Sequence, residues 1–136
     1  MMELKKIQRT CIIDDDPIFI YGTRRIMKEV DFCDNILVFN NGQDAIDGLK
    51  ELIAKGEDLP EVLFLDLNMP IMNGWEFLED FVKIPNPDGK KVIIYIISSS
   101  VDPRDLERIR NYKMVNNYIL KPLSPQDLVN VLQDVA

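Results

Sequence analysis

Two kinds of segment alternate along the chain, and this alternation limits the possible folds more than any other feature. Short runs rich in β-branched residues are separated by longer stretches whose apolar residues recur at helical spacing. The runs that predict strands are residues 7–13, 36–39, 62–65, 92–97 and 117–120. The stretches that predict helices are residues 17–30, 43–55, 75–82, 104–111 and 125–135. Strands that alternate with helices are typical of an α/β fold with a parallel sheet.

The third and fourth runs contain the most apolar sequences, VLFL and VIIYII. Strands of this kind lie inside a sheet that helices cover on both faces, so we expect both runs at its centre. Three predicted helices begin with a capping side chain followed by proline, at Asp16, Asp102 and Ser124. The segment IPNPDGKK predicts a turn-rich loop. Since 136 residues suit one hydrophobic core, we expect residues 1–136 to form a single domain.

The charge balance and residue usage exclude several functions. Sixteen basic and 23 acidic residues give a net charge of -7, which would repel nucleic acid, so we expect no direct nucleic-acid binding. No apolar run approaches the ~20 residues that cross a membrane, and no secretory signal begins the chain, so a cytoplasmic location is expected. The chain has no histidine, which excludes serine-histidine and cysteine-histidine catalysis and most zinc sites.

Polar residues follow four of the predicted strands at the point where each strand ends. In open parallel sheets, ligands bind at the carboxyl ends of the strands, near the position where the strand order reverses. The residues at these ends are Asp14, Asp15 and Asp16, then Asp66, then Ser98, Ser99 and Ser100, and finally Lys121. Carboxylates that meet in a partly buried pocket repel one another unless a cation lies between them. Magnesium fits best, because it prefers oxygen ligands.

Four segments, IIDDDP, LFLDLNMPIMNGWEF, IISSS and YILKPL, resemble in sequence and order the motifs of response-regulator receivers. The resemblance covers essentially the whole chain. It implies a doubly wound, flavodoxin-like α/β domain whose five parallel strands have the order 2-1-3-4-5.

The resemblance also implies a role for each matching residue. Asp66 matches the aspartate that accepts a phosphoryl group as an acyl phosphate. Mg²⁺ would be bound by Asp66, by Asp15 directly, by Asp14 through water, and by the backbone carbonyl of Asn68. Lys121 would pair with the phosphorylated aspartate, and a cis peptide bond often precedes the matching Pro122 in this family.

A second group of residues matches the family's switch. Ser98 and Ser99 would bind the phosphoryl group, and Tyr118 stands at the aromatic position on the fifth strand. When the phosphate draws in the Ser98 hydroxyl, the Tyr118 ring would turn inward and change the surface formed by the fourth helix, fifth strand and fifth helix. The implied partners are a sensor histidine kinase or a histidine phosphotransfer protein as donor, and a downstream protein target.

Other functions remain open at this level. A haloacid-dehalogenase type phosphatase also combines a strand-end aspartate with magnesium, but it normally has a second aspartate two residues later, where this chain has Asn68. A flavin-binding protein would have hydroxyls and glycine after the first strand, where this chain has three aspartates. A degenerate receiver that only binds, and a receiver excised from a larger hybrid kinase or regulator, are further alternatives. We expect a phosphoacceptor that catalyses its own phosphorylation and dephosphorylation and not a multiple-turnover enzyme.

Overall fold

The computed structural model describes residues 7–69, 71–85, 91–100 and 102–135. All five strands are parallel, and they form one sheet in the order β2-β1-β3-β4-β5. The strands are β1 (Ile7–Ile13), β2 (Cys33–Phe39), β3 (Val62–Asp66), β4 (Ile93–Ser98) and β5 (Val115–Leu120). The helices are α1 (Pro17–Glu29), α2 (Gly42–Ala54), α3 (Gly74–Phe81), α4 (Pro103–Arg108) and α5 (Pro125–Val135), with a 3-10 turn, η1 (Ile109–Asn111), after α4. The predicted doubly wound α/β fold and its strand order are confirmed.

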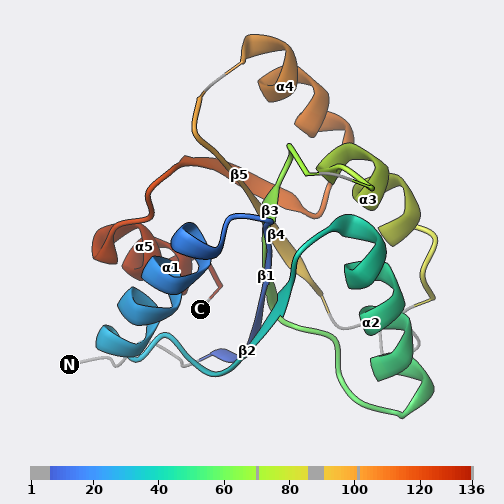
Figure 1. Cartoon of the computed structure of the whole chain (residues 1–136), viewed down its shortest axis with the longest axis horizontal. Coiled ribbons are helices and arrows are strands. Elements are labelled where there is room, and N and C mark those ends of the chain that lie inside the picture. The colour runs from blue at the N-terminus through green and yellow to red at the C-terminus, as the bar shows by residue number, and fades with distance from the viewer. Residues whose placement is uncertain (1–6, 70, 86–90, 101, 136) are drawn as a thin grey trace.

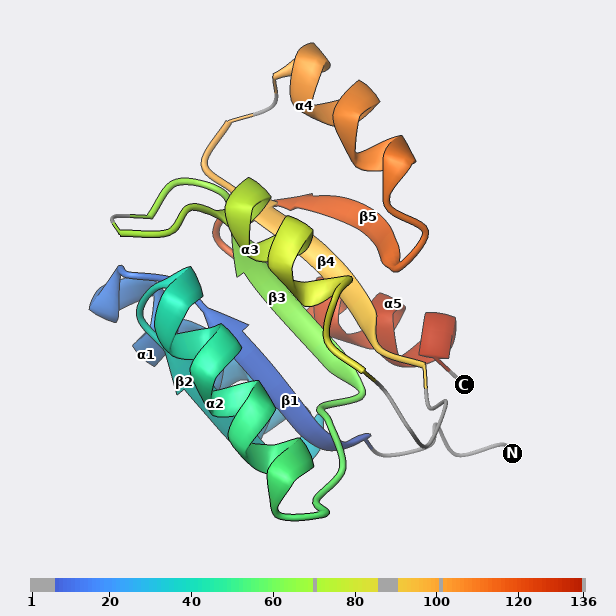
Figure 2. The same ribbon diagram turned by 90° about the vertical axis from the view of Figure 1, so that its right-hand side faces the viewer.

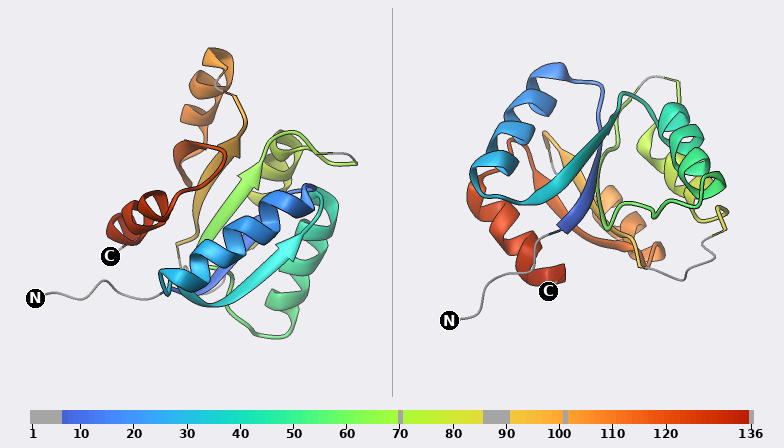
Figure 3. Two further views of the ribbon diagram at one scale, coloured as in Figure 1. Left: turned by 60° about the vertical axis from the view of Figure 1, so that its left-hand side comes forward. Right: turned by 90° about the horizontal axis from the view of Figure 1, so that it is seen from below.

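α1, α2, α3 and α5 form two layers, one on each face of the sheet, whereas α4 stands apart from these layers (Figure 1). Seen from below, α1 and α5 cover one face, whereas α2 and α3 cover the other (Figure 3). Successive side chains of a strand point to opposite faces, so β1 contributes to two cores. Ile12 packs in the core under α1 and α5, and Cys11 and Ile13 pack in the core under α2 and α3. The sheet is therefore buried on both sides, as its apolar sequence predicts.

Burial distinguishes the central strands from the edges. Every residue of β3 is buried, and so is every residue of β4 after Ile93. The edge strands β2 and β5 have only half-buried and exposed residues. The prediction that the third and fourth strands are central is confirmed.

The helix starts follow the predicted capping pattern. The Asp16 side chain accepts a hydrogen bond from the backbone N–H of Ile18, and the Asp102 side chain accepts one from Arg104. Ser124 and Asp127 exchange hydrogen bonds, each side chain accepting from the other's backbone N–H. These caps fix where α1, α4 and α5 begin, directly after the strand-end residues of the candidate site.

Two element boundaries differ from the predictions by three residues, and the others differ by two residues at most. β2 begins at Cys33, where it pairs with Ile7 of β1, although the prediction starts at residue 36. The added residues include the exposed Asp34 and Asn35, and polar residues on a sheet edge do not produce an apolar run. The predicted helix 104–111 ends as a helix at Arg108 and continues as the 3-10 turn η1, with no buried residue in either element.

Two further observations concern the predicted loop and the membrane. Most of the predicted IPNPDGKK loop, residues 86–90, lies outside the described residues. Among the helices described here, none has the length and apolar character needed to cross a membrane.

Candidate functional site

The carboxyl ends of the central strands bring the predicted site residues to one edge of the sheet. β1 lies between β2 and β3. The chain adds β2 on one side of β1, and then β3, β4 and β5 on the other side. Figure 2 shows β1, β3 and β4 side by side, so the loops that follow them begin as neighbours. Asp14 follows β1, Asp66 ends β3 and Ser98 ends β4. This edge is the topological switch point at which open α/β sheets bind ligands.

Three carboxylates meet at this edge. Asp14, Asp15 and Asp66 each place one oxygen within 4.8 Å of the others. Asp14 has no exposed surface and Asp66 is 6% exposed, whereas Asp15 is open to solvent. Asp14 Oδ1 accepts a hydrogen bond of 2.9 Å from the backbone N–H of Asp16, and Asp66 Oδ1 accepts one of 3.3 Å from Asn68. The exposed Asp15 leaves the cluster accessible from solvent.

Lys121 supplies the positive charge within this cluster. Its Nζ lies 2.7 Å from Asp14 Oδ2 and 3.7 Å from Asp66 Oδ2. The same Nζ lies 4.5 Å from the centre of the Phe19 ring, which shields one side of the ammonium group and attracts it. The peptide bond between Lys121 and Pro122 is cis. Lys121 follows the edge strand β5, and its side chain reaches the carboxylate that follows β1 and the carboxylate that ends β3.

The environment of Asp66 disfavours its charged form. Burial is the largest cause, and together with the nearby Asp14 carboxylate it raises the pKa of Asp66 from 3.8 to about 6. The Lys121 ammonium and the hydrogen bond from Asn68 act in the opposite direction, but they are weaker. A cation that joined the cluster would lower this pKa and favour the carboxylate.

The residues present fit a magnesium ion. Three carboxylates face one ammonium group, so the cluster has an excess of negative charge in a partly buried place. Asp14 Oδ2 is buried and has no hydrogen-bond donor in good geometry; its close contact is the ion pair with Lys121. Carboxylate and carbonyl oxygens at a solvent-accessible site are the ligands that magnesium uses while it keeps several waters. An oxygen-binding divalent cation is therefore chemically suited to this edge.

Ser98 connects the cluster with Tyr118. The Ser98 side chain, which is 5% exposed, accepts a hydrogen bond of 3.3 Å from the backbone N–H of Ser100. The hydroxyl of Tyr118 donates a hydrogen bond to the backbone carbonyl of Ser100. The carbonyl of Ser98 in turn accepts from the backbone N–H of Lys121 at 2.8 Å. A continuous chain of hydrogen bonds thus links Ser98, the following loop and the half-buried ring on β5.

The structure places the remaining predicted residues around this centre. Asn68 and Ser99 are exposed at the rim, and Pro122 is exposed after the lysine. The contact between Phe19 and Lys121 was not predicted, because Phe19 reads in the sequence as an ordinary apolar position of a helix. The only sequence signal for it is the position of Phe19 in the first turn after the acidic run.

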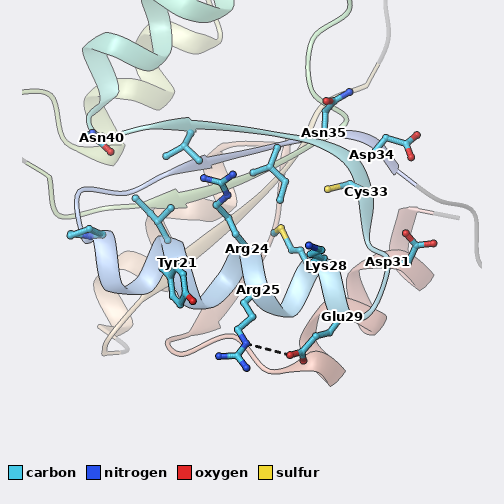
Figure 4. Close-up of a pocket in the computed structure, with 15 residues that line it drawn as sticks. Tyr21, Arg24, Arg25, Lys28, Glu29, Asp31, Cys33, Asp34, Asn35 and Asn40 are labelled. Carbon is cyan, nitrogen blue, oxygen red and sulfur yellow. Dashed lines mark ion pairs between the residues drawn. The ribbon is translucent and has the colours of Figure 1, made fainter.

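A separate groove lies between α1 and β2, with a volume of about 1300 Å³ (Figure 4). Its charged lining is balanced, with cations and anions in equal number: Arg24, Arg25, Lys28, Glu29, Asp31 and Asp34. Arg25 forms an ion pair of 3.6 Å with Glu29 on the same helix. This balanced lining has no charge excess that would select an ionic ligand, unlike the carboxylate cluster.

The fold and the strand-end cluster define a class of doubly wound proteins that hold acids and a lysine at the switch point of the sheet. Comparison with protein-family models matches residues 10–133 with the response regulator receiver domain. The chain therefore belongs to the response regulator receiver family, whose members act in two-component signalling.

Individual relatives agree with this assignment. A chemotaxis protein CheY homolog of Campylobacter jejuni is 39% identical over 103 residues, which cover 75% of this chain and 72% of the relative. The crystal structure of a two-component response regulator from Cytophaga hutchinsonii superimposes with a TM-score of 0.87 at 34% identity, covering 96% of this chain and 98% of the other. The receiver domain of a sensor histidine kinase from Pseudomonas aeruginosa, with a magnesium ion coordinated in its active-site cleft, has a TM-score of 0.72 at 16% identity and covers 93% and 95% of the two chains.

Proposed function

We propose that this receiver is a phosphorylation-controlled switch in which Asp66 accepts a phosphoryl group. One observation carries the proposal: Lys121 Nζ lies 3.7 Å from Oδ2 of Asp66, which belongs to a cluster of three carboxylates. Asp66 is the member of this cluster that combines burial in a strand end with a pKa raised to about 6. Since its carboxylate repels its neighbours, any change that adds positive charge favours its reactive form.

Each side chain has a distinct part in the transfer. An Asp66 oxygen attacks the phosphorus atom in line with the leaving group; a P–O bond to Asp66 forms while the bond to the donor breaks. Lys121 donates hydrogen bonds to a phosphoryl oxygen, and the Ser98 hydroxyl donates another. Asp14, Asp15, Asp66 and the backbone carbonyl of Asn68 would hold Mg²⁺, which neutralises charge on the phosphoryl oxygens.

Residues 1–136 contain no histidine, so a phosphohistidine donor lies outside them. We assign this part to the phosphohistidine of a sensor histidine kinase or histidine phosphotransfer protein. Large apolar side chains are exposed on α1, which follows the acidic run, and in the loop after Asp66: Ile18 is 82% exposed, Tyr21 70% and Ile71 80%. Exposed apolar side chains next to a reactive group favour protein contact over a purely aqueous site.

Signal output is assigned to the surface of α4, β5 and α5. α4 has no buried residue, so its position is held by few core contacts. Because the Ser98 hydroxyl is linked through Ser100 to Tyr118, a phosphoryl group that engages Ser98 would alter the Tyr118 contact on β5. That coupling would change the surface that a downstream target protein binds.

The test of the acceptor uses acetyl phosphate with Mg²⁺ as a small donor. Intact-mass spectrometry of the wild type should show the mass of one added phosphoryl group, and Asp66→Asn should show none. Asp47→Asn is the matched control, because Asp47 is an exposed aspartate on α2. A phosphorylated Asp66→Asn product at the wild-type yield would exclude Asp66 as the acceptor.

A further inference from the structure

The loop that follows the proposed acceptor is attached to α2 through one glycine. The backbone N–H of Gly42, the first residue of α2, donates a hydrogen bond of 3.1 Å to the carbonyl of Met72. The first N–H groups of a helix have no partner within the helix, so this donor is available to the loop. Met72 lies between Asp66 and α3, in the segment that also contains Asn68. α2 and α3 lie side by side on one face of the sheet (Figure 2).

Gly42 also leaves the space that this contact needs. A Cβ atom at residue 42 would lie 2.7 Å from Met72 Cγ and 2.9 Å from the Met72 carbonyl oxygen. Both distances are shorter than real Cβ contacts, and the second involves backbone that cannot move without moving the loop. Gly42 has no positive φ angle, so close approach and not backbone conformation explains a glycine here.

The opposite end of the loop is fixed separately. The backbone N–H of Gly74 donates to the carbonyl of Leu67 at 3.0 Å, which closes the loop at its base. A Cβ at residue 74 would lie 2.7 Å from the carbonyl oxygen of Asp66. The base of the loop is thus attached to the acceptor strand, and its outer part is attached to α2 through Met72. Asn68 lies in the segment between these two attachments.

We propose that Gly42 is a positioning residue for the phosphorylation site. Its N–H binds the Met72 carbonyl, and the absence of a side chain allows this close approach. Through the loop, this contact sets the positions of the Asn68 carbonyl and the Asp66 carboxylate. The inference rests on the proposed function of Asp66 and its magnesium ligands. It adds a residue from α2, an element that contributes no ligand to the site.

The test compares alanine substitutions at three helical glycines. Gly42→Ala should weaken Mg²⁺ binding about tenfold or more and slow phosphorylation by acetyl phosphate, since small displacements of reacting groups cost large factors in rate. Mg²⁺ affinity would be measured by calorimetric titration, and phosphorylation by intact-mass spectrometry over time. Because the added Cβ must displace Met72, thermal melting without Mg²⁺ should fall no further than in Gly48→Ala, where the Cβ also meets a neighbour. A larger loss of Mg²⁺ affinity in Gly42→Ala than in Gly48→Ala would then report the displaced loop.

Two variants serve as controls. Gly22→Ala adds a Cβ in α1 with no atom within 4 Å, so it should leave Mg²⁺ affinity and phosphorylation with acetyl phosphate unchanged. Gly48→Ala adds a Cβ 2.4 Å from the Phe39 ring within the same helix as Gly42, so it should lower the melting temperature without changing Mg²⁺ affinity. Together they separate a general loss of stability from a displaced loop.

The outcomes are distinguishable. If the wild type bound no Mg²⁺ and took up no phosphoryl group, the proposed function itself would fail. If the wild type did both and Gly42→Ala matched it, the positioning role of Gly42 would be overturned. The role would also be overturned if Gly48→Ala weakened Mg²⁺ binding as much as Gly42→Ala, because destabilised packing would then explain both results.

Discussion

The amino group of Lys121 lies closer to Asp14 than to Asp66, at 2.7 Å from the first carboxylate and 3.7 Å from the second. Asp14 is completely buried and Lys121 has 17% of its side chain exposed, so their ion pair is largely shielded from water. A buried carboxylate that loses its cation is costly to keep charged. The lysine assigned to the phosphoryl group therefore also stabilises the folded protein before any phosphoryl group is present.

Replacement of Lys121 should show how much its ion pair with Asp14 stabilises the folded protein. Lys121→Met is expected to lower the free energy of unfolding by about 2–3 kcal/mol in metal-free buffer, below the ~3–5 kcal/mol of fully buried pairs. Millimolar Mg²⁺ should restore part of the loss, since a bound cation replaces the missing charge. Urea unfolding with and without Mg²⁺ measures both effects. Lys113→Met, at an exposed lysine before β5, is the control, and an equal loss in both variants would contradict the prediction.

The raised pKa of Asp66 predicts a pH-dependent effect of Asp66→Asn. The folded protein disfavours the charged carboxylate, whose pKa is about 6 compared with 3.8 ordinarily. The contribution of Asp66 to wild-type stability should therefore fall as the pH rises from about 4 to about 6, because the unfolded chain releases this proton first. Asp66→Asn lacks this loss, so it should be more stable than the wild type above pH 6 and gain little near pH 4, in metal-free urea titrations. A gain that does not depend on pH would contradict the assigned cause.

Magnesium should stabilise the protein without a phosphoryl donor. A ligand that binds only the folded state raises the free energy of unfolding, and the rise grows with the logarithm of the ratio of its concentration to its dissociation constant. Asp15→Ala should remove most of the rise in melting temperature caused by millimolar Mg²⁺. Because Asp15 is exposed, the substitution should change melting little when the metal is absent. An unchanged Mg²⁺ effect in this variant would place the metal elsewhere.

Ser98→Ala should uncouple the site from the output surface. The variant should still bind Mg²⁺ and accept the phosphoryl group, but it loses the hydroxyl that links the site to Ser100 and Tyr118. Backbone amide shifts of α4 and α5, recorded with and without beryllofluoride as the phosphate mimic, measure the coupling. The shift changes should be smaller than in the wild type. Equal changes in both proteins would exclude Ser98 as the coupling residue.

Arg108 should hold α4 against α3. Its guanidinium lies 4.3 Å from the centre of the Trp75 ring, and it forms an ion pair of 3.9 Å with Glu79. Arg108→Ala should cost roughly 0.5–1 kcal/mol and speed hydrogen exchange in α4. Trp75 is the single tryptophan of the chain, so its fluorescence reports the contact directly. Arg110→Ala, at an exposed arginine two residues later, is the control and should leave the emission unchanged.

Much of the site was predictable because it depends on strand ends. The apolar runs of β3 and β4 predict central strands, and Asp66 and Ser98 follow from their ends. Polar residues at the edges were harder to assign: the start of β2 at Cys33 was missed because Asp34 and Asn35 satisfy no apolar pattern.

The sequence by itself determined the order of the elements, the edge at which the acids gather, and the chemistry of oxygen ligands with one lysine. These features follow from local periodicity and from the rule that parallel strands end together. Tertiary structure alone decided that Lys121 lies nearest Asp14, that Phe19 lies beside its ammonium group, and that Gly42 holds Met72. Each contact joins residues far apart in the chain, so its distance depends on strand register and on the packing of helices against the sheet, which no local pattern encodes.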